Sequence, residues 1–89
     1  MPSIAYTPHL RKHLDCADGS FTGATVREVL ESAFLEIPRL RGYLLDDRGR
    51  LRQHVAIFVG GRMIQDRVTQ QDPVAPETEI FVFQALSGG

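Results

Sequence analysis

The two glycines that close the printed sequence have the clearest chemical potential. Gly88 and Gly89 follow the strand-forming run Ile80-Phe81-Val82-Phe83. Because glycine has no side chain, chemistry at these positions must use the backbone and the α-carboxylate. A tail without Cβ atoms can also enter a channel too narrow for other residues. The four residues from Leu86 onwards span roughly 13 Å at most, enough to present a carboxylate to a partner's active site. The alternative is an inert, disordered end, and the glycine pair alone does not decide between the two.

Other chemically capable residues give weaker signals. Cys16 is the only cysteine, so it excludes an internal disulfide and any four-cysteine metal site. Because no nearby charge pattern would lower its pKa, an incidental residue is favoured over a redox or sulfur-relay thiol. His9 and His13 are four residues apart and could share a helical face as metal ligands. They lack a convincing third ligand, which favours a solvated pair and predicts no metal site.

Arginine makes up nine of the ten basic residues and is frequent between residues 39 and 52. This segment could bind a phosphate or an acidic partner. Asp46 and Asp47 dilute its positive charge, which favours a solvated face. Gly60-Gly61 does not indicate a phosphate loop because no helix follows it.

The composition excludes several classes of function. The 89 residues suffice for one domain, 43% of them are hydrophobic, and the net charge is −1. Without a basic excess, a nucleic-acid partner has no electrostatic support. No apolar run approaches the length of a membrane span, and no signal peptide opens the chain, so we expect no membrane association. Together with the lack of disulfides, this favours a cytoplasmic protein.

One helix is strongly predicted. Thr25 is a candidate N-cap, and Glu28 three residues later would complete a capping box. An apolar stripe follows at helical spacing, which indicates one buried face; its residues are Val26, Val29, Leu30, Ala33, Phe34 and Ile37. Leu35 breaks the pattern. Pro38 is expected to stop the helix near Ile37, and Arg39 to Gln53 to form a connection.

Short strands are predicted on both sides of this helix. The expected strands are Ser3–Thr7, a weak one within Cys16–Thr22, His54–Val59, Arg62–Ile64 and Glu79–Leu86, with Gly60-Gly61 as a hairpin turn. One amphipathic helix covers one face of a mixed sheet. If the first and last strands are parallel neighbours, every element finds a partner. We therefore predict an α+β protein with a β-grasp (ubiquitin-like) fold: a domain over 1–86 and a flexible tail over 87–89.

The last strand is apolar on both sides. Ile80 and Val82 form a consistent inward set, which sends Phe81 and Phe83 to the open face of the sheet. By the same alternation Val55, Ile57 and Val59 face inward, whereas Ala56 and Phe58 face outward. The phenylalanines are then either a docking surface or rings covered by loops or belonging to the core. Leu86 and Ser87, at the root of the tail, complete the predicted partner-binding set.

The order of elements and the ending Ala85-Leu86-Ser87-Gly88-Gly89 resemble the ubiquitin-like sulfur carriers. These form the family of the molybdopterin synthase small subunit (MoaD) and the thiamine sulfur carrier (ThiS). Three further stretches carry the resemblance, which covers nearly the whole chain: Gly23 to Leu30, Leu40 to Asp47, and Val55 to Gly61. The poor second strand and Gly60, where many relatives carry Asn or Asp, depart from the pattern.

The resemblance implies a carrier rather than an enzyme. An adenylating partner would use MgATP to convert the Gly89 carboxylate into an acyl-adenylate. A persulfide or other sulfur source would then leave a thiocarboxylate on Gly89, and a synthase subunit would accept the sulfur. Gly88 would let the tail thread, and the chain itself would bind no cofactor. The pathway stays open between molybdopterin, cysteine and thiamine types, and a ubiquitin-like modifier and a plain interaction domain are the alternatives.

Overall fold

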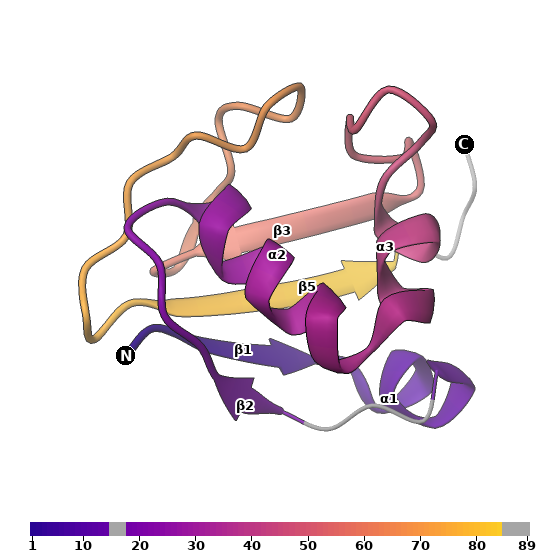
Figure 1. Ribbon diagram of the computed structural model, residues 1–89, viewed down its shortest axis with the longest axis horizontal. Coiled ribbons are helices and arrows are strands. Elements are labelled where there is room, and N and C mark those ends of the chain that lie inside the picture. Colours follow the sequence, from indigo (N-terminus) through magenta and orange to yellow (C-terminus); the bar gives the residue numbers. More distant parts are fainter. Residues whose placement is uncertain (15–17, 85–89) are drawn as a thin grey trace.

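The first and last strands lie side by side in the middle of a mixed sheet. The computed structural model describes residues 1–14 and 18–84. Within them the strands are β1 (Ser3–Tyr6), β2 (Gly19–Ser20), β3 (Val55–Val59), β4 (Arg62–Met63) and β5 (Glu79–Gln84). Their spatial order is β2-β1-β5-β3-β4 (Figure 1). Strand β1 runs parallel to β5, with Ile4 opposite Ile80, and β3 runs antiparallel to β5. The predicted parallel pairing of the chain's first and last strands is confirmed.

Helix α2 (Val26–Glu36) begins where the capping pattern places it. The Thr25 hydroxyl accepts a hydrogen bond from the Glu28 backbone N–H at 3.2 Å. The Glu28 carboxylate accepts one from the backbone N–H of Ala24 at 2.8 Å, one residue earlier than a capping box requires. The apolar stripe is buried up to Phe34, whereas Leu35 is 86% exposed. Ile37 is half-buried and follows the last helical residue.

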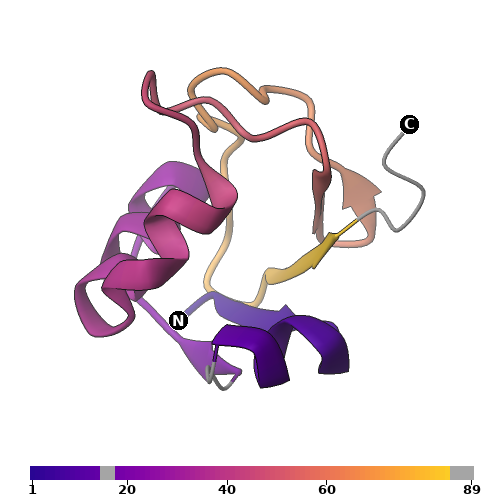
Figure 2. The ribbon, with the colours of Figure 1, turned by 90° about the vertical axis from the view of Figure 1, so that its right-hand side faces the viewer.

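The segment predicted as a connection contains a further helix, so this prediction was wrong. Helix α3 (Pro38–Leu44) begins at the proline that was expected only to end α2. Proline at the first helical position loses nothing, because its missing N–H has no helical partner there. Leu40 and Leu44, four residues apart, are fully buried on one face of this helix. Helices α2 and α3 therefore pack together over one face of the sheet (Figures 1 and 2), where a single main helix was expected.

The N-terminal region also differs in detail from the prediction. The residues after β1, for which the sequence favoured a turn or a short helical stretch over His9–Asp15, form helix α1 (Pro8–Leu14), whose Leu10 and Leu14 enter the core. The weak second strand is reduced to two residues, which pair antiparallel with β1. Its first residue is Gly19, which has no side chain to pack against the sheet and so weakens the strand. Cys16 lies outside the described residues.

The central hairpin matches the prediction. Gly60 and Gly61 have φ angles of 59° and 86°, the left-handed conformation that a tight hairpin turn requires at both positions. Phe58 pairs with Met63 across the two strands.

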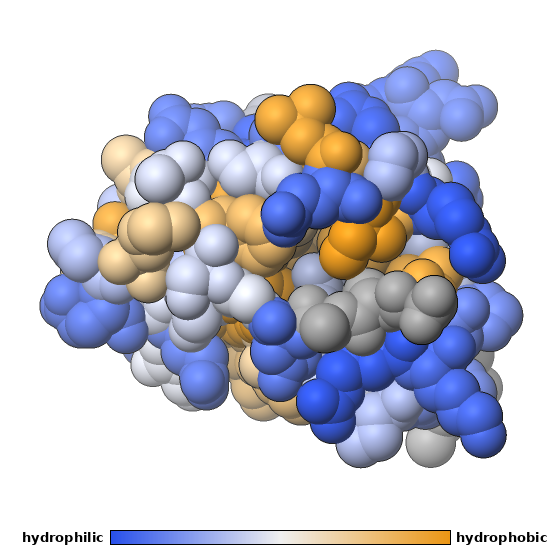
Figure 3. All heavy atoms as spheres, turned by 60° about the horizontal axis from the view of Figure 1, so that its bottom comes forward, coloured by the Kyte–Doolittle hydropathy of each residue, from blue (hydrophilic) through white to orange (hydrophobic). Residues whose placement is uncertain are grey.

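Turned so that the bottom of Figure 1 comes forward, the molecule shows a broken hydrophobic patch bordered by hydrophilic atoms (Figure 3). Among the helices that the structure describes, none is long and apolar enough to cross a membrane.

Candidate docking site around the last strand

Three phenylalanine rings form a cluster on the sheet face opposite α2 and α3. Ile80 and Val82 of β5 are fully buried in the core, and the alternating residues Phe81 and Phe83 are half-buried. The ring centroids of Phe58 and Phe83 lie 5.2 Å apart, and those of Phe81 and Phe83 lie 5.9 Å apart. Both distances are in the range of favourable aromatic pairs. The predicted inward and outward sets of β5 are therefore found, and the rings are not members of the buried core.

Small and flexible residues surround the phenylalanine cluster. Ala5 of β1 lies opposite Phe81, and Ala56 of β3 lies opposite Phe83. Methyl groups at these positions leave the sides of the rings open. Met63 extends the apolar surface towards β4 and is 52% exposed. Sequence reasoning missed Met63, although the Gly60-Gly61 turn fixes the register that places it beside Phe58.

The burial of side chains along strand β3 follows the predicted alternation except at its last residue. Val55 and Ile57 are buried as expected, and Ala56 and Phe58 are half-buried as expected for the opposite face. Val59, predicted to face inward, is only half-buried, although it packs against the core. It is the last residue before the hairpin turn, where the sheet ends and cover is incomplete.

Aromatic side chains gather around the end of β5. Gln84 is the last described residue before the predicted tail, and it pairs with Val55. The Tyr43 hydroxyl donates a hydrogen bond to the Gln84 side-chain oxygen. The Tyr43 ring lies 5.5 Å from the His13 ring and 5.9 Å from the His54 ring, between centroids. The end of β5 is thus tied to α3, a contact that sequence reasoning missed because α3 itself was not predicted.

His9 and His13 were considered as metal ligands and interpreted as a solvated pair. The His9 and His13 rings stack with centroids 6.2 Å apart, and both residues are exposed. Within residues 1–14 and 18–84, no group of three or more potential metal ligands comes together. Leu86, Ser87, Gly88 and Gly89 lie outside the described residues.

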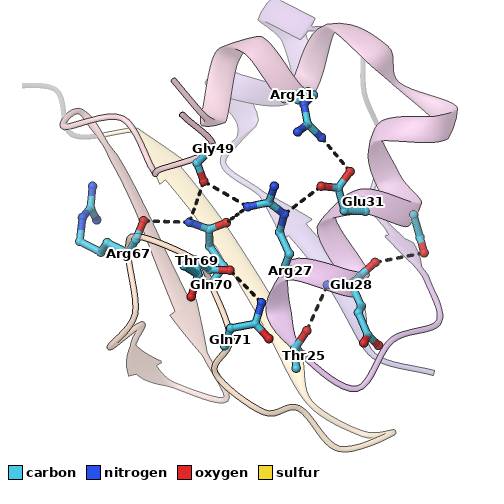
Figure 4. A network of polar contacts seen from close by, with 11 residues as sticks. Thr25, Arg27, Glu28, Glu31, Arg41, Gly49, Arg67, Thr69, Gln70 and Gln71 are labelled. Carbon is cyan, nitrogen blue, oxygen red and sulfur yellow. Dashed lines mark hydrogen bonds and ion pairs between the residues drawn. The ribbon is translucent and has the colours of Figure 1, made fainter. Parts of the chain in front are cut away.

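A polar network holds the connection between α3 and β3 against α2 (Figure 4). Glu31 accepts hydrogen bonds from Arg41 at 2.7 Å and Arg27 at 2.8 Å. Burial opposes ionisation of Glu31, but the bonds and charges of the two arginines outweigh it and lower the pKa of this carboxyl. Arg27 also donates to the Gly49 carbonyl at 3.1 Å and to the side-chain oxygen of fully buried Gln70 at 2.8 Å. The loops on this side are therefore fixed relative to the helix.

The fold places the chain in the ubiquitin-like β-grasp class. The defining features are a mixed sheet with parallel first and last strands at its centre, and helices packed on one face. The ThiS family model matches residues 13–89. The chain belongs to the ThiS family, whose members are ubiquitin-like sulfur carriers of the ThiS and MoaD type.

Solved structures agree on the fold. One is the Amycolatopsis orientalis BexX/CysO complex, which matches with a TM-score of 0.84 and 17% identity over 100% of both chains. Mycobacterium tuberculosis CysO matches with a TM-score of 0.82 and 18% identity, covering 97% of this chain and 100% of that one. SAMP1 from Haloferax volcanii matches with a TM-score of 0.78 and 21% identity, over 99% and 98%. A comparison with curated protein sequences found no match.

Proposed function

We propose that this chain carries sulfur as a thiocarboxylate on Gly89 and delivers it to a biosynthetic enzyme. The observation that carries the proposal is the ThiS family match, which extends through Gly88 and Gly89. The described part of the chain supports it: β5 leads directly towards these glycines, and an apolar face lies beside β5. The chain is then a substrate of an adenylating enzyme, and that enzyme binds the MgATP.

The chemistry follows from the poor reactivity of a carboxylate, whose leaving group would be oxide. In the first step a Gly89 carboxylate oxygen attacks the α-phosphorus of ATP, and pyrophosphate leaves. In the second step a persulfide on a sulfur donor attacks the acyl carbon, and AMP leaves. A thiol then cleaves the resulting acyl disulfide, supplying two electrons as it is oxidised to a disulfide. The thiocarboxylate remains on Gly89. This chain contributes the acyl carbon and a narrow tail. Gly88, which has no side chain, lets the tail enter the partner's channel.

The phenylalanine cluster gives the partners a surface to grip. Phe81 and Phe83 are half-buried residues of β5, and β5 is the strand that leads to the tail. A partner that binds Phe58, Phe81 and Phe83 therefore also orients the reacting carboxylate. Leu86 and Ser87 complete the contact at the entrance to the partner's channel. The same surface serves the adenylating enzyme and the sulfur-accepting synthase in turn.

Intact mass spectrometry tests this function. The chain is incubated with a ThiS-type adenylating enzyme, MgATP and a persulfide donor with a thiol reductant. A mass gain equal to the exchange of one oxygen for one sulfur supports the carrier. A ladder of higher-mass conjugates supports a ubiquitin-like modifier instead. The same enzyme is also tested on its own carrier. If that carrier is thiolated and the mass of this chain is unchanged, the result supports a plain interaction domain. The last two outcomes both contradict the proposal.

A further inference from the structure

A basic groove lies beside the end of β5, on a different surface from the phenylalanine cluster. Its volume is about 620 Å³, and its walls come from Asp46 and the segments 50–54 and 67–68. An adjoining hollow shares Asp46, Arg50 and Arg52 with it and adds Asp47 and Arg48. Together they present four arginines against two aspartates, in a chain whose net charge is −1. The two hollows therefore carry a local excess of positive charge, although the chain as a whole is slightly negative.

Two of these arginines are held in place without a counter-ion. Arg52 donates from Nε to the Gly42 carbonyl at 2.8 Å, and Arg67 donates to the Arg52 carbonyl at 2.8 Å. Neither forms an ion pair with any of the residues that the structure describes, and both are half-buried. By contrast Arg50 is paired with Asp46 at 3.2 Å. A partly buried guanidinium that is fixed by neutral carbonyls keeps its charge and its remaining N–H groups for an incoming acceptor.

The nearby carboxylates are occupied elsewhere. Asp66, next to Arg67 in sequence, accepts backbone N–H bonds from Val68, Thr69 and Gln71 at 3.1, 2.9 and 3.1 Å. Asp46 accepts backbone N–H bonds from Arg48 and Arg50 at 2.9 and 3.0 Å. These bonds keep the two carboxylates in their own turns. They are therefore not the missing counter-ions of Arg52 and Arg67.

Gln70 keeps the two walls of the groove together from behind. Its side-chain nitrogen donates to the Arg67 carbonyl at 2.8 Å and to the Gly49 carbonyl at 3.3 Å. In Figure 4 the Arg67 carbonyl faces Gln70, whereas the Arg67 side chain extends away from this network. Gln70 is fully buried and has a φ angle of 54°, a conformation that a non-glycine residue adopts only when its surroundings impose it. The groove is thus preorganised.

Its position links the groove to the tail. His54 lines it and directly precedes Val55, the partner of Gln84 across β3 and β5. Tyr43 contacts both His54 and Gln84. A protein that contacts the end of β5 at Gln84 therefore lies next to the groove. Guanidinium groups bind carboxylates through paired N–H···O bonds, and the two interspersed aspartates disfavour a dense polyanion such as nucleic acid.

We propose that this groove binds an acidic segment of the partner that receives the tail. This contact is made in addition to the one at the phenylalanine cluster. The proposal rests on the proposed function for the presence of such a partner. The carboxylates of the segment bind Arg52 and Arg67, which lack a counter-ion, and the segment crosses the end of β5. Correct docking of the tail then requires both an apolar and a charged contact.

Titrations followed by NMR test this binding without ATP or sulfur, so their failure is separate from failure of the proposed function. The ¹⁵N-labelled chain is titrated with a hexaglutamate peptide, with hexaglutamine and with inorganic phosphate. We expect saturable shifts at Arg52, His54 and Arg67 with hexaglutamate, none with hexaglutamine, and weaker binding of phosphate. The Arg52→Gln/Arg67→Gln double variant should bind hexaglutamate about tenfold more weakly, as expected for two partly exposed charge contacts. Arg39→Gln is the matched control, because Arg39 is exposed on α3 and forms no ion pair with the described residues.

Four results would overturn the proposal. Shifts spread over the whole surface, or equal binding by the double variant, would show that the groove is not the site. Binding of phosphate as tight as that of hexaglutamate would assign the groove to a small anion. The single variants Arg52→Gln and Arg67→Gln serve if the double variant does not fold, because each removes one of the two guanidinium groups that are fixed by neutral carbonyls. Full affinity in both single variants would also contradict the proposal.

Discussion

Replacing Phe83 by alanine should weaken partner binding more than it weakens the fold. A phenylalanine side chain buries 150–250 Å² when it is fully covered, by the usual range for aromatic residues, and Phe83 is half-buried in the free chain. A partner would then remove about 100 Å² more from water, which is worth about 2.5 kcal/mol at 25 cal/mol per Å². We therefore expect Phe83→Ala to lower affinity by about 1–3 kcal/mol, or roughly 5- to 150-fold.

Val82→Ala is the matched control, because Val82 is the neighbouring residue on the same strand and is fully buried. It should cost about 2 kcal/mol of unfolding free energy by loss of buried methyl groups and the cavity left behind. Its folded fraction should bind the partner normally. Phe83→Ala should cost roughly 1–2 kcal/mol of stability, mainly the contacts with Phe58 and Phe81.

The assay combines urea unfolding of each variant with calorimetric titration of the adenylating partner. The reasoning would be refuted if Phe83→Ala destabilised the fold as much as Val82→Ala does while its folded fraction bound the partner with unchanged affinity. The phenylalanine rings would then serve the fold alone. Phe81→Ala should behave like Phe83→Ala, since the two rings stack.

Three further predictions, made with four variants, have defined outcomes. Removing Gly89, or replacing Gly88 by valine, should abolish sulfur loading without changing the melting temperature, and sulfur loading of the chain lacking Gly89 would contradict the proposed chemistry. Thr25→Ala should lower the unfolding free energy by about 1 kcal/mol, since the Thr25 hydroxyl caps α2; an unchanged urea midpoint would show that the cap contributes nothing. Hydrogen bonds from the Thr69 side chain and from the backbone of Thr69, Gln71 and Val68 lower the pKa of Asp66 to about 2, so its stabilising effect is present above its unfolded pKa of about 4 and is lost as pH falls to about 2. The loss of stability between these pH values should be smaller in Asp66→Asn than in the parent chain, and identical pH profiles would show that Asp66 is not responsible.

The sequence predicted those elements whose local signals agree with their tertiary surroundings. The capped, striped helix α2 and the Gly60-Gly61 hairpin were found as predicted. The inward set of β5 follows from strict alternation, and its parallel pairing with β1 follows from the need to give every element a partner. The family resemblance was confirmed by the match over residues 13–89.

The errors have a physical cause in each case. Pro38 ends one helix and starts the next, and its sequence signal is the same for both roles. Because α3 was missed, the Tyr43–Gln84 contact at the end of β5 was also missed. The groove depends on long-range bonds such as Arg67 to the Arg52 carbonyl. Local sequence does not show that an arginine lacks a counter-ion, so the arginine-rich segment was interpreted as a solvated face.

Locating the added sulfur on one residue tests the central proposal most directly. After incubation with the adenylating enzyme, MgATP and the persulfide donor, the chain is alkylated and fragmented in a mass spectrometer. A Cys16→Ser variant serves as the control, because Cys16 is the only cysteine and is the other residue able to hold transferred sulfur. We predict that the oxygen-to-sulfur exchange lies on Gly89 and is fully retained in Cys16→Ser. Sulfur found on Cys16, and lost in Cys16→Ser, would contradict the proposed role of the Gly89 carboxylate.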